Sequence, residues 1–95
     1  MMRLCWSERF RTELRNEYEY LRRENPDVAR GVIHRILEAS RRLSEFPRSG
    51  RTWRLEGAWE LVIPGAPYVV IYDIGDDSVV LLTLFHTSRR IPHIH

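Results

Sequence analysis

The fold is decided by residues 59–86, WELVIPGAPYVVIYDIGDDSVVLLTLFH, in which three apolar segments alternate with two short breaks. The first break, PGAP at 64–67, holds two prolines and a glycine, and the second is GDD at 75–77; both are typical of turns. Strands joined by turns this short predict an antiparallel meander over 59–63, 68–74 and 78–86. The last two strands are apolar at nearly every position, so we expect both faces to be covered, within the chain or by a partner.

Two amphipathic segments precede the meander and predict a helical hairpin. Ser7 can cap the first helix, and Asn25 can end it and cap a second helix that begins with Pro26 and runs to about residue 45. Because the connection is so short, the two helices should pack antiparallel. Apolar residues recur on one face of the first helix at spacings of four, four and three: Phe10, Leu14, Tyr18 and Leu21.

The alternating segment MRLCW at 2–6 reads as a first strand. The element order is then β-α-α-β-β-β, which predicts an α+β fold with the helix hairpin packed on one face of a small curved antiparallel sheet. We expect a single domain over residues 1–95. Gly31 lies inside the second helix at a cost of about 1 kcal/mol relative to alanine, and a close helix crossing would explain it.

Composition restricts the classes of protein. A hydrophobic content of 43% predicts a folded chain, and the single cysteine, Cys5, excludes an internal disulfide, as in a reducing cytoplasm. No apolar run approaches the roughly 20 residues of a membrane span, and the start lacks the pattern of a secretory signal. We therefore expect a cytoplasmic protein without membrane contact. A net charge of +2 does not identify a nucleic-acid binder.

The order of these signals resembles the RelE/ParE superfamily of toxins from bacterial type II toxin–antitoxin pairs. The resemblance covers about residues 3–92, and PGAPYVVIY is similar to the ParE branch. Its most specific parts are Asn25-Pro26 with Ala29, then Leu43, Phe46, Pro47, Gly50 and Arg51, then the ELVIPG and PYVVIY segments, and His86 followed by Arg89.

This resemblance implies a compact toxin that is neutralised by a small cognate antitoxin in a hetero-oligomer. RelE-like members cleave mRNA in the ribosome. ParE-like members instead inhibit DNA gyrase and perform no chemistry on nucleic acid, so no sequence-specific nucleic-acid binding is expected of them. The two branches must be separated by the chemistry of the residues.

RNA cleavage without a metal needs a base, an acid and cations for the phosphate. RelE-like relatives supply these from cationic residues on the central strands and from a tyrosine, histidine or glutamate near the C-terminus. This chain has Trp59 where relatives carry an arginine before ELV, which removes a phosphate clamp. The ionisable or phenolic groups on its three strands are Glu60, Tyr68, Tyr72, Asp73 and His86. These residues favour action by binding over catalysis, and the resemblance to the ParE branch implies a DNA gyrase inhibitor. The alternative that stays open is an enzyme, a RelE-like ribosome-dependent mRNA endoribonuclease.

His86 with Arg89 and Arg90 is the best candidate for a phosphate or carboxylate site. An imidazole can act as acid or base near neutral pH, so catalysis is one interpretation, and gripping a partner's carboxylates is a second. In the third, His86 ends a strand and hydrogen-bonds a neighbouring backbone group.

We expect a partner to be bound by an apolar, strand-rich face with a cationic and aromatic edge. The candidate partner-binding residues are Arg51, Trp53, Arg54, Trp59, His86, Arg89 and Arg90. In the nuclease alternative, His86 is acid or base and Arg51, Arg54 or Arg89 holds phosphate. No cofactor is expected, and His93 and His95 alone do not make a metal site, because zinc needs three or four converging ligands.

Overall fold

The computed structural model describes residues 1–54 and 57–88, and its element order agrees with the predicted β-α-α-β-β-β class. The helices are α1 (Glu8–Glu24) and α2 (Pro26–Arg41), followed by the short 3-10 turns η1 (Arg42–Ser44) and η2 (Pro47–Ser49). The strands are β1 (Arg3–Trp6), β2 (Arg51–Thr52), β3 (Ala58–Val62), β4 (Tyr68–Ile74) and β5 (Ser78–His86). The two-residue strand β2 was not predicted.

Both predicted helix caps are confirmed. Ser7 Oγ accepts a hydrogen bond from the Phe10 N–H at 2.9 Å. Asn25 has extended backbone angles, which end α1, and its Oδ1 accepts from the N–H groups of Asp27 and Val28 at the start of α2. Each cap satisfies N–H groups that lack a partner within the helix. The hairpin connection is therefore a single residue.

The explanation predicted for Gly31 is wrong. A Cβ built on this glycine meets no atom within 4 Å, so no neighbouring element approaches α2 closely there. Gly31 is exposed, and its cost to the helix is not offset by packing.

Within the described residues, five strands form one sheet in the order β1-β5-β4-β3-β2. The meander β3-β4-β5 is antiparallel as predicted, and β2 adds antiparallel to β3. The sheet is nevertheless mixed, because β1 pairs parallel to β5. Strand β1 is connected to the meander through the whole helical hairpin, so no tight turn requires it to run antiparallel.

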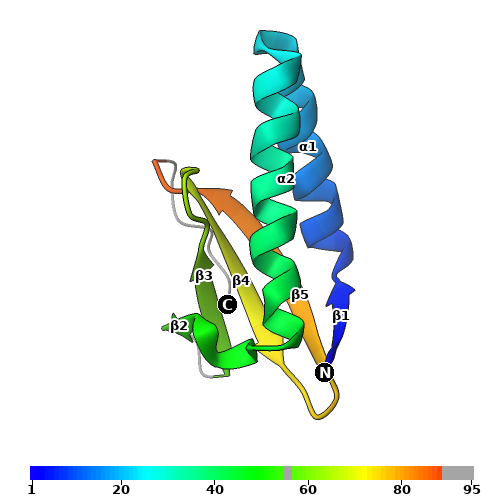
Figure 1. Cartoon of the computed structure of the whole chain (residues 1–95), viewed down its shortest axis with the longest axis vertical. Helices are drawn as coiled ribbons and strands as arrows, with labels where there is room; N and C mark the ends of the chain where they lie inside the picture. Colours follow the sequence, from blue (N-terminus) through cyan, green and yellow to red (C-terminus); the bar gives the residue numbers. More distant parts are fainter. Residues whose placement is uncertain (55–56, 89–95) are drawn as a thin grey trace.

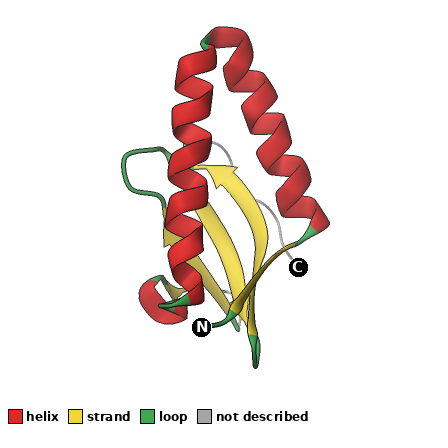
Figure 2. Ribbon diagram, turned by 45° about the vertical axis from the view of Figure 1, so that its right-hand side comes forward, coloured by secondary structure: helices red, strands yellow, loops and turns green. Residues whose placement is uncertain are grey.

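The hairpin packs on one face of the sheet, here called the inner face, and extends beyond the sheet at one end (Figures 1 and 2). The main core lies between the two layers and includes Phe10, Leu14, Ile36, Tyr68, Val70, Tyr72, Leu81 and Leu84. The opposite, outer face carries a second apolar cluster of Ala58, Val69 and Ile71 packed with Trp53, Leu82 and Phe85. Residues 68–72 of β4 are all buried, which confirms for this strand that both faces are covered.

Candidate partner-binding site

Strand β5 has a bulge next to the outer-face cluster. The register passes from the pair Ile71–Thr83 to the pair Tyr72–Leu81, so Leu82 has no partner in β4. The parallel pairing with β1 also ends at Leu81. Backbone groups on this edge of β5 therefore need partners other than a strand.

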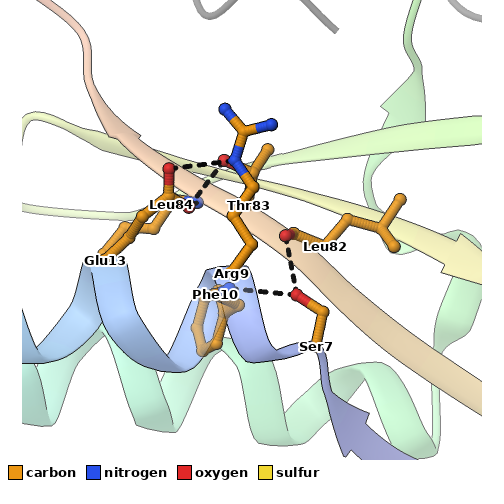
Figure 3. Close-up of polar contacts among 7 residues, drawn as sticks. All are labelled: Ser7, Arg9, Phe10, Glu13, Leu82, Thr83 and Leu84. Carbon is orange, nitrogen blue, oxygen red and sulfur yellow. Dashed lines mark hydrogen bonds and ion pairs between the residues drawn. The ribbon is translucent and has the colours of Figure 1, made fainter.

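The beginning of α1 supplies these partners, as Figure 3 shows. The Ser7 hydroxyl donates to the Leu82 carbonyl at 2.8 Å. Glu13, on the next turn of α1, accepts through Oε1 from the Thr83 hydroxyl at 2.7 Å and from the Leu84 N–H at 2.9 Å. Side chains of α1 thus occupy this edge of β5, and a partner cannot extend the sheet along residues 82–84 without displacing them.

A cavity of about 300 Å³ opens on the outer face beside this junction. Its wall is predominantly apolar, and the half-buried ring of Trp53 forms one side. The cavity is lined by Ser7, Arg9, Trp53, Ala58, Ile71, Leu82 and Thr83. We call it the outer groove. A concave apolar site of this kind suits an aliphatic or aromatic side chain of a partner.

A buried tyrosine holds the segment that leads into β2. The Tyr72 hydroxyl donates to the Pro47 carbonyl at 2.7 Å and accepts from the Gly50 N–H at 3.1 Å. Burial raises the pKa of Tyr72 above its usual value, because the charged phenolate would lose its hydration. A Cβ on Gly50 would lie 2.4 Å from the Glu60 carbonyl oxygen and 2.6 Å from the Tyr72 hydroxyl, so only glycine fits there.

Three of the candidate residues follow this anchored segment and come together. Arg51 forms an ion pair with Glu60 of β3, its direct cross-strand partner. Glu60 pairs with Ile71 in turn, so the ion pair lies on the outer face. The Trp53 N–H donates to the Ala58 carbonyl at 2.9 Å, and the Arg54 guanidinium carbon lies 5.2 Å from the centroid of the Trp53 ring, a cation–π distance.

His86 lies on the opposite face of the sheet. Its cross-strand partner is Tyr68, a main-core residue, and the two rings meet edge to face at 5.1 Å. The Tyr68 hydroxyl donates to Glu17 of α1 at 2.7 Å. The Ser88 N–H donates to His86 Nδ1 at 3.2 Å. This confirms that His86 ends a strand and bonds a neighbouring backbone group.

Trp59 does not join the outer groove. Trp59 lies on the inner face, where it packs against the main core with its ring centroid 6.4 Å from that of Tyr72. Arg89 and Arg90, together with His93 and His95, fall outside the described residues. The arrangement predicted for His86 with Arg89 and Arg90 therefore stays a prediction.

Sequence reasoning missed the side chains that α1 contributes to the site. Glu13 contacts Arg9 through its second oxygen, with Oε2 3.2 Å from Nε, and that arginine lines the outer groove. In the sequence both residues look like the solvated face of an amphipathic helix. The one available signal was Thr83, a polar residue within an otherwise apolar strand that needs a partner when buried.

Residues 1–54 and 57–88 contain no group of three or more histidine, cysteine, aspartate or glutamate side chains placed to hold a metal ion. In that same part of the chain, no helix is both long enough and apolar enough to cross a bilayer.

The architecture is that of the RelE and ParE toxins. One solved structure, "Chromosomal ParDE TA system from P. aeruginosa", contains a chain that matches with a TM-score of 0.81 at 20% identity over 93% of this chain and 98% of that one. The isolated E. coli RelE toxin matches with a TM-score of 0.62 at 16% identity, over 95% of this chain and 88% of that one. At these identities the likeness shows the fold.

Sequence comparison shows the family. Residues 4–91 match the family described as "ParE toxin of type II toxin-antitoxin system, parDE", and the chain belongs to this toxin family. "Putative toxin Y4kP" of Sinorhizobium fredii (strain NBRC 101917 / NGR234) is 35% identical over 97% of this chain and 95% of that protein. "Toxin RelE2" of Caulobacter vibrioides (strain ATCC 19089 / CIP 103742 / CB 15) is 27% identical over 94% and 99% of the two chains.

Proposed function

We propose that this toxin acts in the cytoplasm by binding and inhibiting DNA gyrase, and that its cognate antitoxin neutralises it by covering the outer face. Membership of the ParE family supports the target. The observation that carries the mode of action is the outer groove, an apolar cavity between the start of α1 and Trp53 that suits an anchoring side chain. No cofactor enters this proposal.

The rim of the outer groove suits a partner with carboxylates beside its apolar anchor. Arg54 stacks on Trp53 and forms no ion pair with any described residue, so it is available to an acidic group. The side chain of Arg51 is 74% exposed although it is paired with Glu60, whose side chain is only 18% exposed. Because a guanidinium carries five N–H donors, Arg51 can meet an antitoxin carboxylate while it keeps its pair with Glu60.

The placement of His86 favours binding over RNA cleavage. A general acid or base must reach the same phosphate as the cations that stabilise it. His86 lies on the inner face beside Tyr68, whereas Arg51 lies on the outer face with Glu60 and Arg54 lies over the ring of Trp53. The described residues thus keep the parts of the predicted nuclease site on different sides of the sheet.

Induction of the chain in cells, with and without its antitoxin, tests the proposal. We expect a DNA damage response and arrested replication, while the 5′ ends of cellular transcripts stay unchanged. Transcripts cut at defined codon positions, with DNA replication unaffected, would establish the endoribonuclease alternative instead.

A further inference from the structure

A second apolar cleft lies away from the outer groove and shares no lining residue with it. Its volume is about 650 Å³, within the range of roughly 300–1,000 Å³ found for ligand pockets. The lining includes Met2, Phe46, Pro47 and Ile74, with Arg48 and Asp76 at the same cleft. Figure 1 shows the N-terminus and the β4–β5 turn together at this end of the molecule, opposite the tip of the hairpin.

Phe46 stands at this cleft with 61% of its surface exposed. Its backbone is held from both sides, because its N–H donates to the Arg42 carbonyl at 2.9 Å and its carbonyl accepts from the Ser49 N–H at 3.0 Å. The main chain is therefore fixed in a position that keeps the ring out of the core. An exposed aromatic ring beside an apolar cleft marks an interaction surface.

The charges at this cleft are of opposite sign and lack partners. Among the described residues, Arg48 and Asp76 form no ion pair, whereas the neighbouring Asp77 pairs with Arg3. One surface thus presents a projecting aromatic ring, an apolar recess, one free cation and one free anion. Such a surface is complementary to itself, which is the requirement of an interface with two-fold symmetry.

We infer that this cleft is a homodimerisation surface, in which each copy inserts Phe46 into the cleft of the other while Arg48 of each copy meets Asp76 of the other. The cleft is lined by eight of the described residues, which is few beside the roughly 20–30 residues per partner of a stable interface. The dimer is accordingly reversible and forms as the concentration rises. The inference does not depend on the target of the toxin.

Sedimentation equilibrium of the full chain over a wide concentration range tests the inference. We expect the weight-average mass to rise from monomer towards dimer with concentration. Phe46→Ser should weaken the association by at least about tenfold, since it removes the anchor. The control Val28→Ser changes a side chain of similar exposure, 49%, on a different surface and should leave the association unchanged.

The contact proposed between Arg48 of one copy and Asp76 of the other allows a sharper test. Arg48→Asp leaves two acidic groups at the cleft, and Asp76→Arg leaves two basic groups, so each variant alone should dimerise less than the original chain. An equimolar mixture of the two restores both opposite-charge contacts, and its association should exceed that of either variant alone. A constant monomer mass, a dimer unaffected by Phe46→Ser, or a mixture no more associated than its components would overturn the inference. Loss of antitoxin affinity in Phe46→Ser without any dimer would assign the cleft to the antitoxin instead.

Discussion

Replacement of Glu13 by alanine should be among the most destabilising changes on the surface of α1. The substitution removes the acceptor for the Thr83 hydroxyl and the Leu84 N–H, and these residues are only 1% and 3% exposed. Each buried group left without a partner costs about 1–3 kcal/mol, so the free energy of unfolding should fall by about 4 kcal/mol. A small domain has only about 5–15 kcal/mol in total.

Three further substitutions test whether the loss of these two hydrogen bonds is what destabilises Glu13→Ala. Glu13→Gln keeps an acceptor oxygen and should lose only about 1 kcal/mol, because the half-exposed contact with Arg9 contributes little. Thr83→Val removes the hydroxyl that Glu13→Ala would leave without an acceptor. Glu13→Ala should therefore lower the free energy of unfolding less in the Thr83→Val background than in the original chain. Glu19→Ala breaks an exposed ion pair on the same helix and should leave the free energy of unfolding nearly unchanged.

Urea unfolding of the free chain, followed by circular dichroism, measures the four single variants and the Glu13→Ala/Thr83→Val double variant. The coupling energy of Glu13 and Thr83, obtained from the double-mutant cycle, should be at least about 1 kcal/mol. If Glu13→Ala lowers the free energy of unfolding by less than about 1 kcal/mol, or if the effects of Glu13→Ala and Thr83→Val are strictly additive, then the Glu13 carboxylate is not what satisfies the buried groups at this edge of β5.

Three other predictions concern the helix, the β2 anchor and the groove. Gly31→Ala should raise the free energy of unfolding by about 1 kcal/mol in urea titrations, because the added methyl group meets no atom; destabilisation would show that α2 is crowded there. Tyr72→Phe should lower it by about 1–2 kcal/mol. Because the pKa of Tyr72 is raised in the folded chain, the unfolded chain loses the phenolic proton at a lower pH than the folded chain does. The contribution of the Tyr72 hydroxyl to stability should therefore be complete below about pH 10 and decline above it. In Tyr72→Phe this decline with rising pH should be absent. Trp53→Ala should weaken antitoxin binding at least about tenfold in calorimetric titrations while Tyr20→Ala does not; equal affinities would place the antitoxin elsewhere.

Much of the fold was predictable because local signals agreed with it. The pair Asn25-Pro26 ends one helix and begins the next through the geometry of those two residues alone. The bounds of β4 and β5 coincide with the predicted apolar segments, since PGAP and GDD interrupt the chain on both sides of β4.

The features that escaped prediction depend on contacts between distant residues. Strand β2 is only two residues long and exists because Tyr72 and Gly50 hold its approach to the sheet. The bulge at Leu82 leaves the run of apolar residues in β5 unchanged, so periodicity cannot reveal it.

The candidate site was predictable only in part, for the same reason. Arg51, Trp53 and Arg54 are close in sequence and stay together in space. Trp59 and His86 were grouped with them by residue type, but strand alternation directs both to the inner face.

We propose that the toxin does its damage by binding gyrase, without turnover. The most direct measurement is DNA supercoiling by purified gyrase titrated with the full chain, with and without the antitoxin. We expect inhibition that reaches completion near stoichiometric amounts of toxin and is reversed by the antitoxin. Unimpaired supercoiling at a large excess of toxin, together with multiple cuts per toxin molecule in ribosome-bound mRNA, would contradict the account.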